Sequence, residues 1–192
     1  MLSRTIKLAV LTLLTYLLQA TTAQYISVWD VAPNIALAFI AVVTVGYGPM
    51  YTLIMSLAVG YLMEIMLAGM QFFNLVLYPV SSMLGALAFA DKSERSLEER
   101  RAQGRDTRQL NPHLRTPLCA MVAIVVFEFI HVIYIYLTGV DLDAGHIQRA
   151  LVDVVYTMLL AAVFQFPLRA YLGIYRQNRE NRERQQEERR SI

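Results

Sequence analysis

The chain has 192 residues, of which 56% are hydrophobic and 17% are charged, a balance too apolar for an ordinary soluble domain of this length. The net charge is only +2, and acidic residues are interleaved with the basic ones, which argues against a nucleic-acid-binding protein. The single cysteine, Cys119, excludes an intrachain disulfide and argues against a thiolate metal site. The composition therefore predicts an all-α, multi-pass membrane protein with one membrane domain.

The basic residues are distributed unevenly along the chain. All of the seventeen Lys and Arg residues except Arg149 lie in three stretches, residues 1–7, 92–115 and 169–190. The segments between these stretches are long and apolar. This is the positive-inside pattern, and it predicts that both termini and the stretch 92–115 lie on the cytoplasmic side of a membrane.

The first expected span, residues 6–22, follows two cations and ends in Thr21-Thr22-Ala23, which resembles a signal-peptidase site. Because several more spans follow, we interpret it as a retained helix. The next apolar stretch is too long for one span and is interrupted by Gly46-Tyr47-Gly48-Pro49, which predicts two antiparallel helices joined by a tight cytoplasmic turn. Asp30 is expected to cap the second helix, with Pro33 in its first turn.

Aromatic residues Tyr25 and Trp29 suit the outer membrane interface. Further along, Pro79 is expected to kink the fourth helix or to shift its hydrogen bonding. We expect a polar cytoplasmic loop at 91–115, an outer loop at 139–148 and a charged cytoplasmic tail at 173–192. The membrane domain is expected to cover residues 1–172, as a bundle of six transmembrane helices at 6–22, 31–45, 50–67, 73–90, 117–138 and 150–172.

Polar and small residues recur about one turn apart on four of these helices, so that each set lies on one helix face. They are Thr52, Ser56, Gly60 and Glu64 on the third, Asn74, Tyr78, Ser81, Ser82 and Gly85 on the fourth, Glu128 and His131 on the fifth, and Asp153, Thr157, Ala161 and Gln165 on the sixth. Two interpretations stay open. These faces pack helices together, or the ionisable residues line a cavity.

Glu64, Glu128, His131 and Asp153 all fall in the outer half of their spans, where they could line a pocket open to the outside. Glu128-x-x-His131 resembles half of a di-metal helix motif, but a second copy is missing. No catalytic triad, phosphate-binding glycine loop or pair of catalytic carboxylates can be assembled. The sequence therefore predicts no enzyme, no metal site and no cofactor.

The order of motifs in 32–85 resembles the bacterial rod shape-determining MreD family. The resemblance is carried by Pro33-Asn34 at the start of the second span, then Gly46, Gly48-Pro49, Ser56, Gly60 and Glu64, and finally Tyr78-Pro79 and Gly85. Length and span number fit from Leu8 to Tyr171. In many family members Asp occupies the positions of Asn34 and Glu64.

This resemblance implies a non-enzymatic protein of the bacterial cytoplasmic membrane that works in lateral cell-wall elongation. The implied partners are an MreC-like periplasmic protein, an MreB-like filament, and the glycosyltransferase and transpeptidase that build peptidoglycan. The family is also related in fold to the substrate-binding subunits of energy-coupling-factor vitamin transporters, which have six helices and an outward-facing pocket. A small-molecule-binding transporter subunit is therefore the alternative function, although the first helix lacks the Ala-x-x-x-Ala face typical of those subunits.

The cytoplasmic cations allow two interpretations. They determine topology, or they dock an acidic partner surface or anionic lipid. The candidates for docking are Arg100, Arg101, Arg105, Arg176, Arg179 and Arg182.

Overall fold

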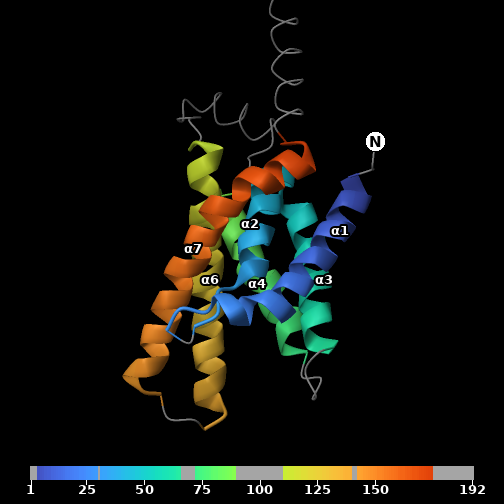
Figure 1. Cartoon of the computed structure of the whole chain (residues 1–192). Helices are drawn as coiled ribbons and strands as arrows, with labels where there is room; N and C mark the ends of the chain where they lie inside the picture. The colour runs from blue at the N-terminus through green and yellow to red at the C-terminus, as the bar shows by residue number, and fades with distance from the viewer. Residues whose placement is uncertain (1–3, 30, 66–71, 90–109, 140–141, 175–192) are drawn as a thin grey trace, which may run out of the picture.

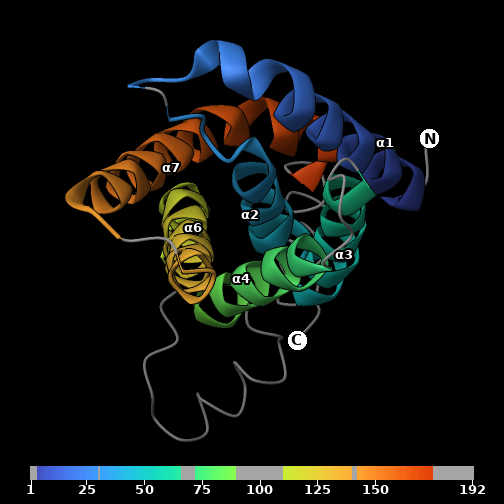
Figure 2. The same cartoon turned by 90° about the horizontal axis from the view of Figure 1, so that it is seen from below.

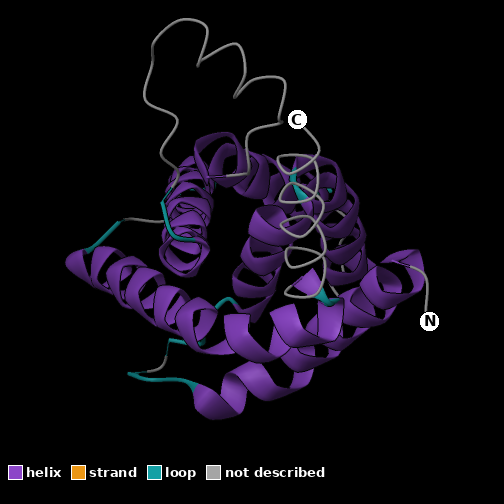
Figure 3. Ribbon diagram, turned by 90° about the horizontal axis from the view of Figure 1, so that it is seen from above, coloured by secondary structure: helices purple, strands orange, loops and turns teal. Residues whose placement is uncertain are grey.

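A computed structural model of the chain describes residues 4–29, 31–65, 72–89, 110–139 and 142–174. Within these ranges the secondary structure is helical, with an isolated β-bridge between Val28 and Val31 and no strand, as Figure 3 shows. This confirms the all-α prediction for the described residues. The helices are α1 (Arg4–Leu17), α2 (Ile35–Tyr47), α3 (Pro49–Ile65), α4 (Phe73–Phe89), α6 (Pro112–Leu137) and α7 (Ala144–Leu172). A π-helical turn (Leu18–Thr22) and a 3-10 turn (Ala23–Ile26) follow α1.

Helix α2 lies at the centre of the bundle, with the other helices arranged around it (Figure 2). Every residue from Ile35 to Val45 is buried. The segment is apolar on all sides, which is the pattern of a helix without a solvent face. Only Gly48, at φ +89°, separates α2 from α3. The expected tight turn is therefore present, and Pro49 is the first residue of α3.

Successive helices run in opposite directions, so that the start of α1 and the last turn of α7 lie at the same end (Figure 1). The Lys and Arg residues at this end, which we call the basic end, are Arg4, Lys7, Arg115 and Arg169. The described Asp and Glu residues lie toward the opposite, acidic end, together with Arg149; they are Glu64, Glu128, Asp143 and Asp153.

Three helices are long and apolar enough to cross a membrane, namely Arg4–Thr22, Pro112–Leu137 and Ala144–Leu172. The other three helices in the described residues are apolar but shorter. Large apolar side chains such as Leu13, Leu57 and Val163 are exposed on the outside of the bundle, as expected for a surface that faces lipid rather than water.

Helices α6 and α7 begin five or six residues earlier than predicted, whereas α1 and α3 begin within two residues of the predicted start. Helix α6 begins at Pro112 rather than Pro117, because the Asn111 side chain accepts a hydrogen bond from the His113 N–H at 3.1 Å and Pro112 supplies the first helical residue. Helix α7 begins at Ala144 rather than 150. There Asp143 is the N-cap, and its carboxylate accepts from the His146 backbone N–H at 3.1 Å. Residues 112–115 and 144–149 are therefore helical and not parts of loops.

Helix α2 begins later than predicted. Its N-cap is Asn34, whose side chain accepts from the Leu37 N–H at 3.0 Å. Pro33 precedes this cap instead of lying in the first turn, and Asp30 lies outside the described residues. In α4 the helix continues through Pro79. Several predicted segments lie outside the described residues, namely the span ends beyond Ile65 and Phe89, the loop 91–109 and the tail 175–192. The same holds for the docking candidates Arg100, Arg101, Arg105, Arg176, Arg179 and Arg182.

Candidate functional site

Polar side chains from α7 contact the N-terminus of the central helix. The Asn34 N–H donates to Thr157 Oγ1 at 2.9 Å and to Asp153 Oδ1 at 3.2 Å. The Thr157 hydroxyl in turn donates to Asp153 Oδ1 at 2.8 Å. All three residues are buried. Asp153 therefore places an acidic group at the positive end of the α2 dipole, where an anion is favoured.

A residue that the sequence analysis passed over, Gln19, completes the cap of α2. Its Oε1 accepts from the Ala36 N–H at 3.1 Å, and its Nε2 donates to the Pro33 carbonyl at 3.3 Å. Gln19 lies in the π-helical turn after α1. The first backbone donors of a helix have no partner within the helix, and in α2 they are satisfied by Gln19 and Asn34.

Two more helices contribute to the same cluster. Glu128 of α6 lies close enough to Asp153 for the two carboxyl groups to interact electrostatically, and Tyr78 of α4 lies next to the Asn34 side chain. We call Asn34, Tyr78, Glu128, Asp153 and Thr157 the polar centre. It joins residues from four helices at the acidic end of the bundle.

His131 lies beside the polar centre in an aromatic setting. Its ring centroid is 6.2 Å from that of Phe127 and 6.4 Å from that of Phe73. Phe127 also contacts Tyr78, with a centroid distance of 5.2 Å. These rings fill the contact between α4 and α6.

Glu64 does not join the polar centre. It is 3% exposed and its Oε2 accepts from the Asn74 N–H at 2.9 Å, in the first turn of α4. Of the four residues predicted to line an outer pocket, Glu64 therefore lies apart from Glu128, His131 and Asp153. Across the described part of the chain, no group of three or more His, Cys, Asp or Glu residues is placed to hold a metal ion.

At the basic end, two arginines are buried among helix ends. Arg115 donates from Nε (3.0 Å) and Nη2 to the carbonyl of Phe89, the last residue of α4. Arg169 Nη2 donates to the Pro112 carbonyl and to Thr116 Oγ1, both at 2.7 Å. Arg115 is 5% exposed and Arg169 is 3% exposed. From the sequence they were interpreted only as topology signals. Each lies two residues from a proline, Pro117 or Pro167, at one end of an apolar segment, and this was the signal that could have identified them.

Gln165 has a related role in α7. Its Nε2 donates to the His113 carbonyl at 3.2 Å. In a regular helix that carbonyl would accept from the N–H four residues later, but this residue is Pro117, which has no N–H. Gln165 therefore supplies a donor that α6 itself lacks.

The predicted polar faces lie between helices. The Thr52 hydroxyl donates to Thr44 Oγ1 at 2.9 Å, and a Cβ on Gly60 would lie 2.6 Å from the Asn74 carbonyl oxygen. On Gly85 it would lie 3.1 Å from the Cys119 carbonyl oxygen, and on Gly46 it would overlap Ile174. Ser56, Ser81, Ser82, Thr157, Ala161 and Gln165 are also buried, whereas Asn74, Glu128 and His131 are partly buried.

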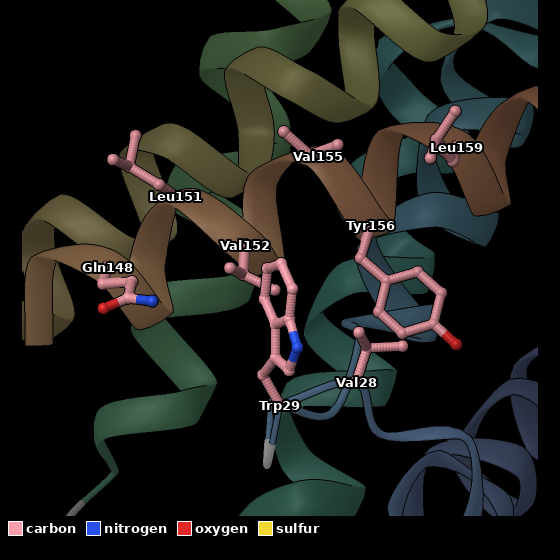
Figure 4. Close-up of a pocket in the computed structure, with 8 residues that line it drawn as sticks. All are labelled: Val28, Trp29, Gln148, Leu151, Val152, Val155, Tyr156 and Leu159. Carbon is pink, nitrogen blue, oxygen red and sulfur yellow. The ribbon is translucent and has the colours of Figure 1, made fainter. Parts of the chain in front are cut away.

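Two pockets lie beside the first turns of α7, away from the polar centre. The larger is an apolar groove of about 510 Å³, lined by Val28 and Trp29 on one side and by α7 residues from Gln148 to Leu159 on the other (Figure 4). The smaller, of about 150 Å³, includes Val31 and Arg149. Neither is lined by Glu64, Glu128, His131 or Asp153.

Comparison of the chain with protein-family models, with curated proteins and with solved structures yields no match.

Proposed function

We propose that this protein is a non-enzymatic membrane scaffold of the bacterial cell-wall elongation machinery, of the MreD type. The observation that carries the proposal is the position of the motif residues that gave the resemblance. Gly60 and Gly85 permit close contacts between helix backbones. Glu64 and Asn34 satisfy helix N-termini. A chain whose characteristic residues build the bundle, rather than line a pocket, suits a protein that acts by holding partners.

The proposed topology has six spans with both termini in the cytoplasm of a bacterial cell. It is supported by the alternating helix directions (Figure 1) and by the gathering of Arg4, Lys7, Arg115 and Arg169 at one end. Three helices have the length and hydropathy of spans, and a central α2 flanked by other helices can be shorter, since it does not face lipid along its length. Under the positive-inside rule the basic end is cytoplasmic.

The proposed partners are an MreC-like periplasmic protein, an MreB-like filament and the wall glycosyltransferase and transpeptidase. The test is depletion in a rod-shaped host together with a pull-down from gently solubilised native membranes. We expect cells to become round and the pull-down to recover these proteins. Normal rod shape on depletion, together with no wall-synthesis protein recovered, would contradict the proposal.

Contacts on the cytoplasmic side form a separate part of the proposal. We assign them to Arg100, Arg101, Arg105, Arg176, Arg179 and Arg182. Replacing the last three by Gln should reduce partner recovery at low salt and have little effect at high salt, because screening already weakens exposed charges there. Unchanged recovery at low salt would reject electrostatic docking by the tail.

The polar centre favours one second candidate, a small-molecule-binding transporter subunit. It gathers Asn34, Tyr78, Glu128, Asp153 and Thr157 near one end of the bundle, where buried ionisable groups are a pointer to ligand sites. Native mass spectrometry of the gently purified protein tests it. A co-purified small molecule that Glu128→Gln and Asp153→Asn release would support this candidate, and its absence from protein purified from native membranes would reject it.

A further inference from the structure

The apolar groove lies on the outside of α7 and is closed on its other side by the loop before α2. A pair of 3.0 Å hydrogen bonds between Val28 and Val31 holds this loop, with Trp29 at φ +52°. The Tyr156 hydroxyl ties the loop to α7 by donating to the Ile26 carbonyl at 2.5 Å. Figure 4 shows the Trp29 ring and Val28 standing beside α7 side chains from Gln148 to Leu159. The groove is thus formed by two segments, the loop at Val28–Val31 and α7, that hydrogen bonds hold together.

The small pocket adjoins the groove, because both are lined by Trp29, Gln148 and Val152. It adds Arg149, the one cation of the chain outside the three basic stretches. Arg149 is exposed, and no hydrogen bond or ion pair joins its side chain to another residue in the described ranges. The positive charge of Arg149 therefore lies next to the apolar groove. This arrangement is complementary to a molecule with an anionic head and an apolar chain.

We propose that the groove and the small pocket together bind one anionic phospholipid of the outer leaflet. Its phosphate contacts Arg149 and Gln148, and one acyl chain lies along the groove past Leu151 and Val155 toward Leu159. The polar part lies near the start of α7 and the apolar part further along the helix, which is the order that headgroup and chain have in a bilayer. The site requires that α7 crosses the membrane, but it does not depend on the scaffold function.

The length of the groove favours a lipid over a partner helix. From Gln148 to Leu159 it follows α7 for about 16 Å at a rise of about 1.5 Å per residue. That is roughly half of the hydrocarbon thickness of about 30 Å, and so the depth of one leaflet. A spanning partner helix would need a contact face about twice as long. Its volume of about 510 Å³ lies within the range of small-molecule sites, roughly 300–1,000 Å³.

The experiment uses the full-length protein in nanodiscs made of equal parts phosphatidylglycerol and phosphatidylcholine. Native mass spectrometry measures which lipid stays bound, and a phosphatidylglycerol with a photoreactive acyl chain maps the contact. Arg149→Gln removes the charge and Val155→Trp fills the groove. Val163→Trp is the matched control, because Val163 is exposed on the same helix outside the groove. Thermal unfolding checks each variant, and Leu159→Trp replaces Val155→Trp if the latter does not fold.

In the wild type we expect crosslinks at Leu151, Val155 and Leu159 and a preference for phosphatidylglycerol. Arg149→Gln should lower that preference about fivefold, the loss expected for one cation near a membrane surface, while the chain still crosslinks. Val155→Trp should abolish crosslinks to Leu151 and Leu159, and Val163→Trp should change neither result.

Three results would overturn the proposal. The first is an unchanged lipid preference in Arg149→Gln, and the second is a wild-type crosslink yield in the groove-filling variant. The third is a photocrosslinker at position 155 that captures, in native membranes, the transmembrane segment of another protein instead of lipid. That result would assign the groove to a partner helix.

Discussion

The Glu64 carboxylate accepts a hydrogen bond from the backbone N–H of Asn74 at 2.9 Å. Glu64 lies in the last turn of α3 and Asn74 in the first turn of α4, so an acid meets the positive end of a helix. At the other end of α4, Arg115 donates to the Phe89 carbonyl. Lys7 similarly donates to the Tyr171 carbonyl near the end of α7, at 3.0 Å. The separation of acids and bases along the bundle thus matches the polarity of α4 and α7, whose N-termini lie at the acidic end and whose C-termini lie at the basic end.

Replacing Glu64 should destabilise the start of α4. Glu64→Ala leaves the partly buried Asn74 N–H without its acceptor, which costs about 1 kcal/mol of unfolding free energy, the low end of the range for a buried donor. Glu64→Gln keeps an acceptor oxygen and should cost less. Reversible unfolding in detergent measures both, with Tyr61→Ala, on an exposed position of α3, as the control. Equal losses in the Ala and Gln variants would show that the hydrogen bond to Asn74 is not what Glu64 contributes.

Replacing Arg115 should loosen the contact between α4 and α6. Its guanidinium directs two donors at one carbonyl oxygen of Phe89, and hydrogen bonds to charged groups contribute about 1.5–3 kcal/mol. Arg115→Gln should lose most of this stabilisation. Arg115→Lys should lose an intermediate amount, because the lysine ammonium lacks the planar, two-donor geometry of the guanidinium. Hydrogen exchange of the last turn of α4 reports the effect locally. Unchanged protection there in Arg115→Gln would contradict this role.

Gly60→Ala should separate α3 from α4. The added Cβ would lie 2.6 Å from the Asn74 carbonyl oxygen, so the backbones must move apart, at a cost of about 1–3 kcal/mol. Leu57→Ala is the control on the same helix, because Leu57 is exposed and its truncation leaves the contact intact. Unfolding in detergent compares the two. A Gly60→Ala protein as stable as the wild type would mean that this close approach can relax freely.

The sequence could predict the features that depend on residues close together in the chain, but not those that depend on residues far apart in it. Four-residue spacing identified the buried faces of α3 and α7, because periodicity is local. The starts of α6 and α7 were misplaced, since the caps at Asn111 and Asp143 lie in polar segments that hydropathy assigns to loops. The contact between Asn34 and Asp153 joins residues 119 apart in the chain, and no local pattern specifies it.

Low pH should destabilise the first turn of α7. The hydrogen bond from His146, at 2.8 Å between Nδ1 and Oδ1, holds the pKa of Asp143 below its ordinary value of 3.8. A carboxyl with a lowered folded pKa contributes its full stabilisation above the unfolded value, and loses it as pH falls through the folded value. Amide exchange at His146, corrected for intrinsic rates, should therefore accelerate only below pH 3.8.

Asp143→Asn provides the control for this titration. Asparagine caps helices about as well as aspartate, but it does not titrate in this range. The variant should keep the turn at neutral pH and show no acid-dependent step. If the wild-type step has its midpoint above pH 3.8, or if the Asn variant retains the step, titration of the Asp143 cap is not its cause.

Asp153 and Thr157 should act as one unit at the start of α2. Both accept from the Asn34 N–H, and Thr157 also donates to Asp153, so the loss of either residue changes what the other contributes. Asp153→Ala and Thr157→Val should therefore show a coupling energy of about 0.5–3 kcal/mol in a double-mutant cycle. Pairing Asp153→Ala with the distant Leu57→Ala should be additive within about 0.5 kcal/mol. If the first pair is equally additive, then Asn34 is held at the N-terminus of the central helix by other contacts, and the polar centre does not act as a network.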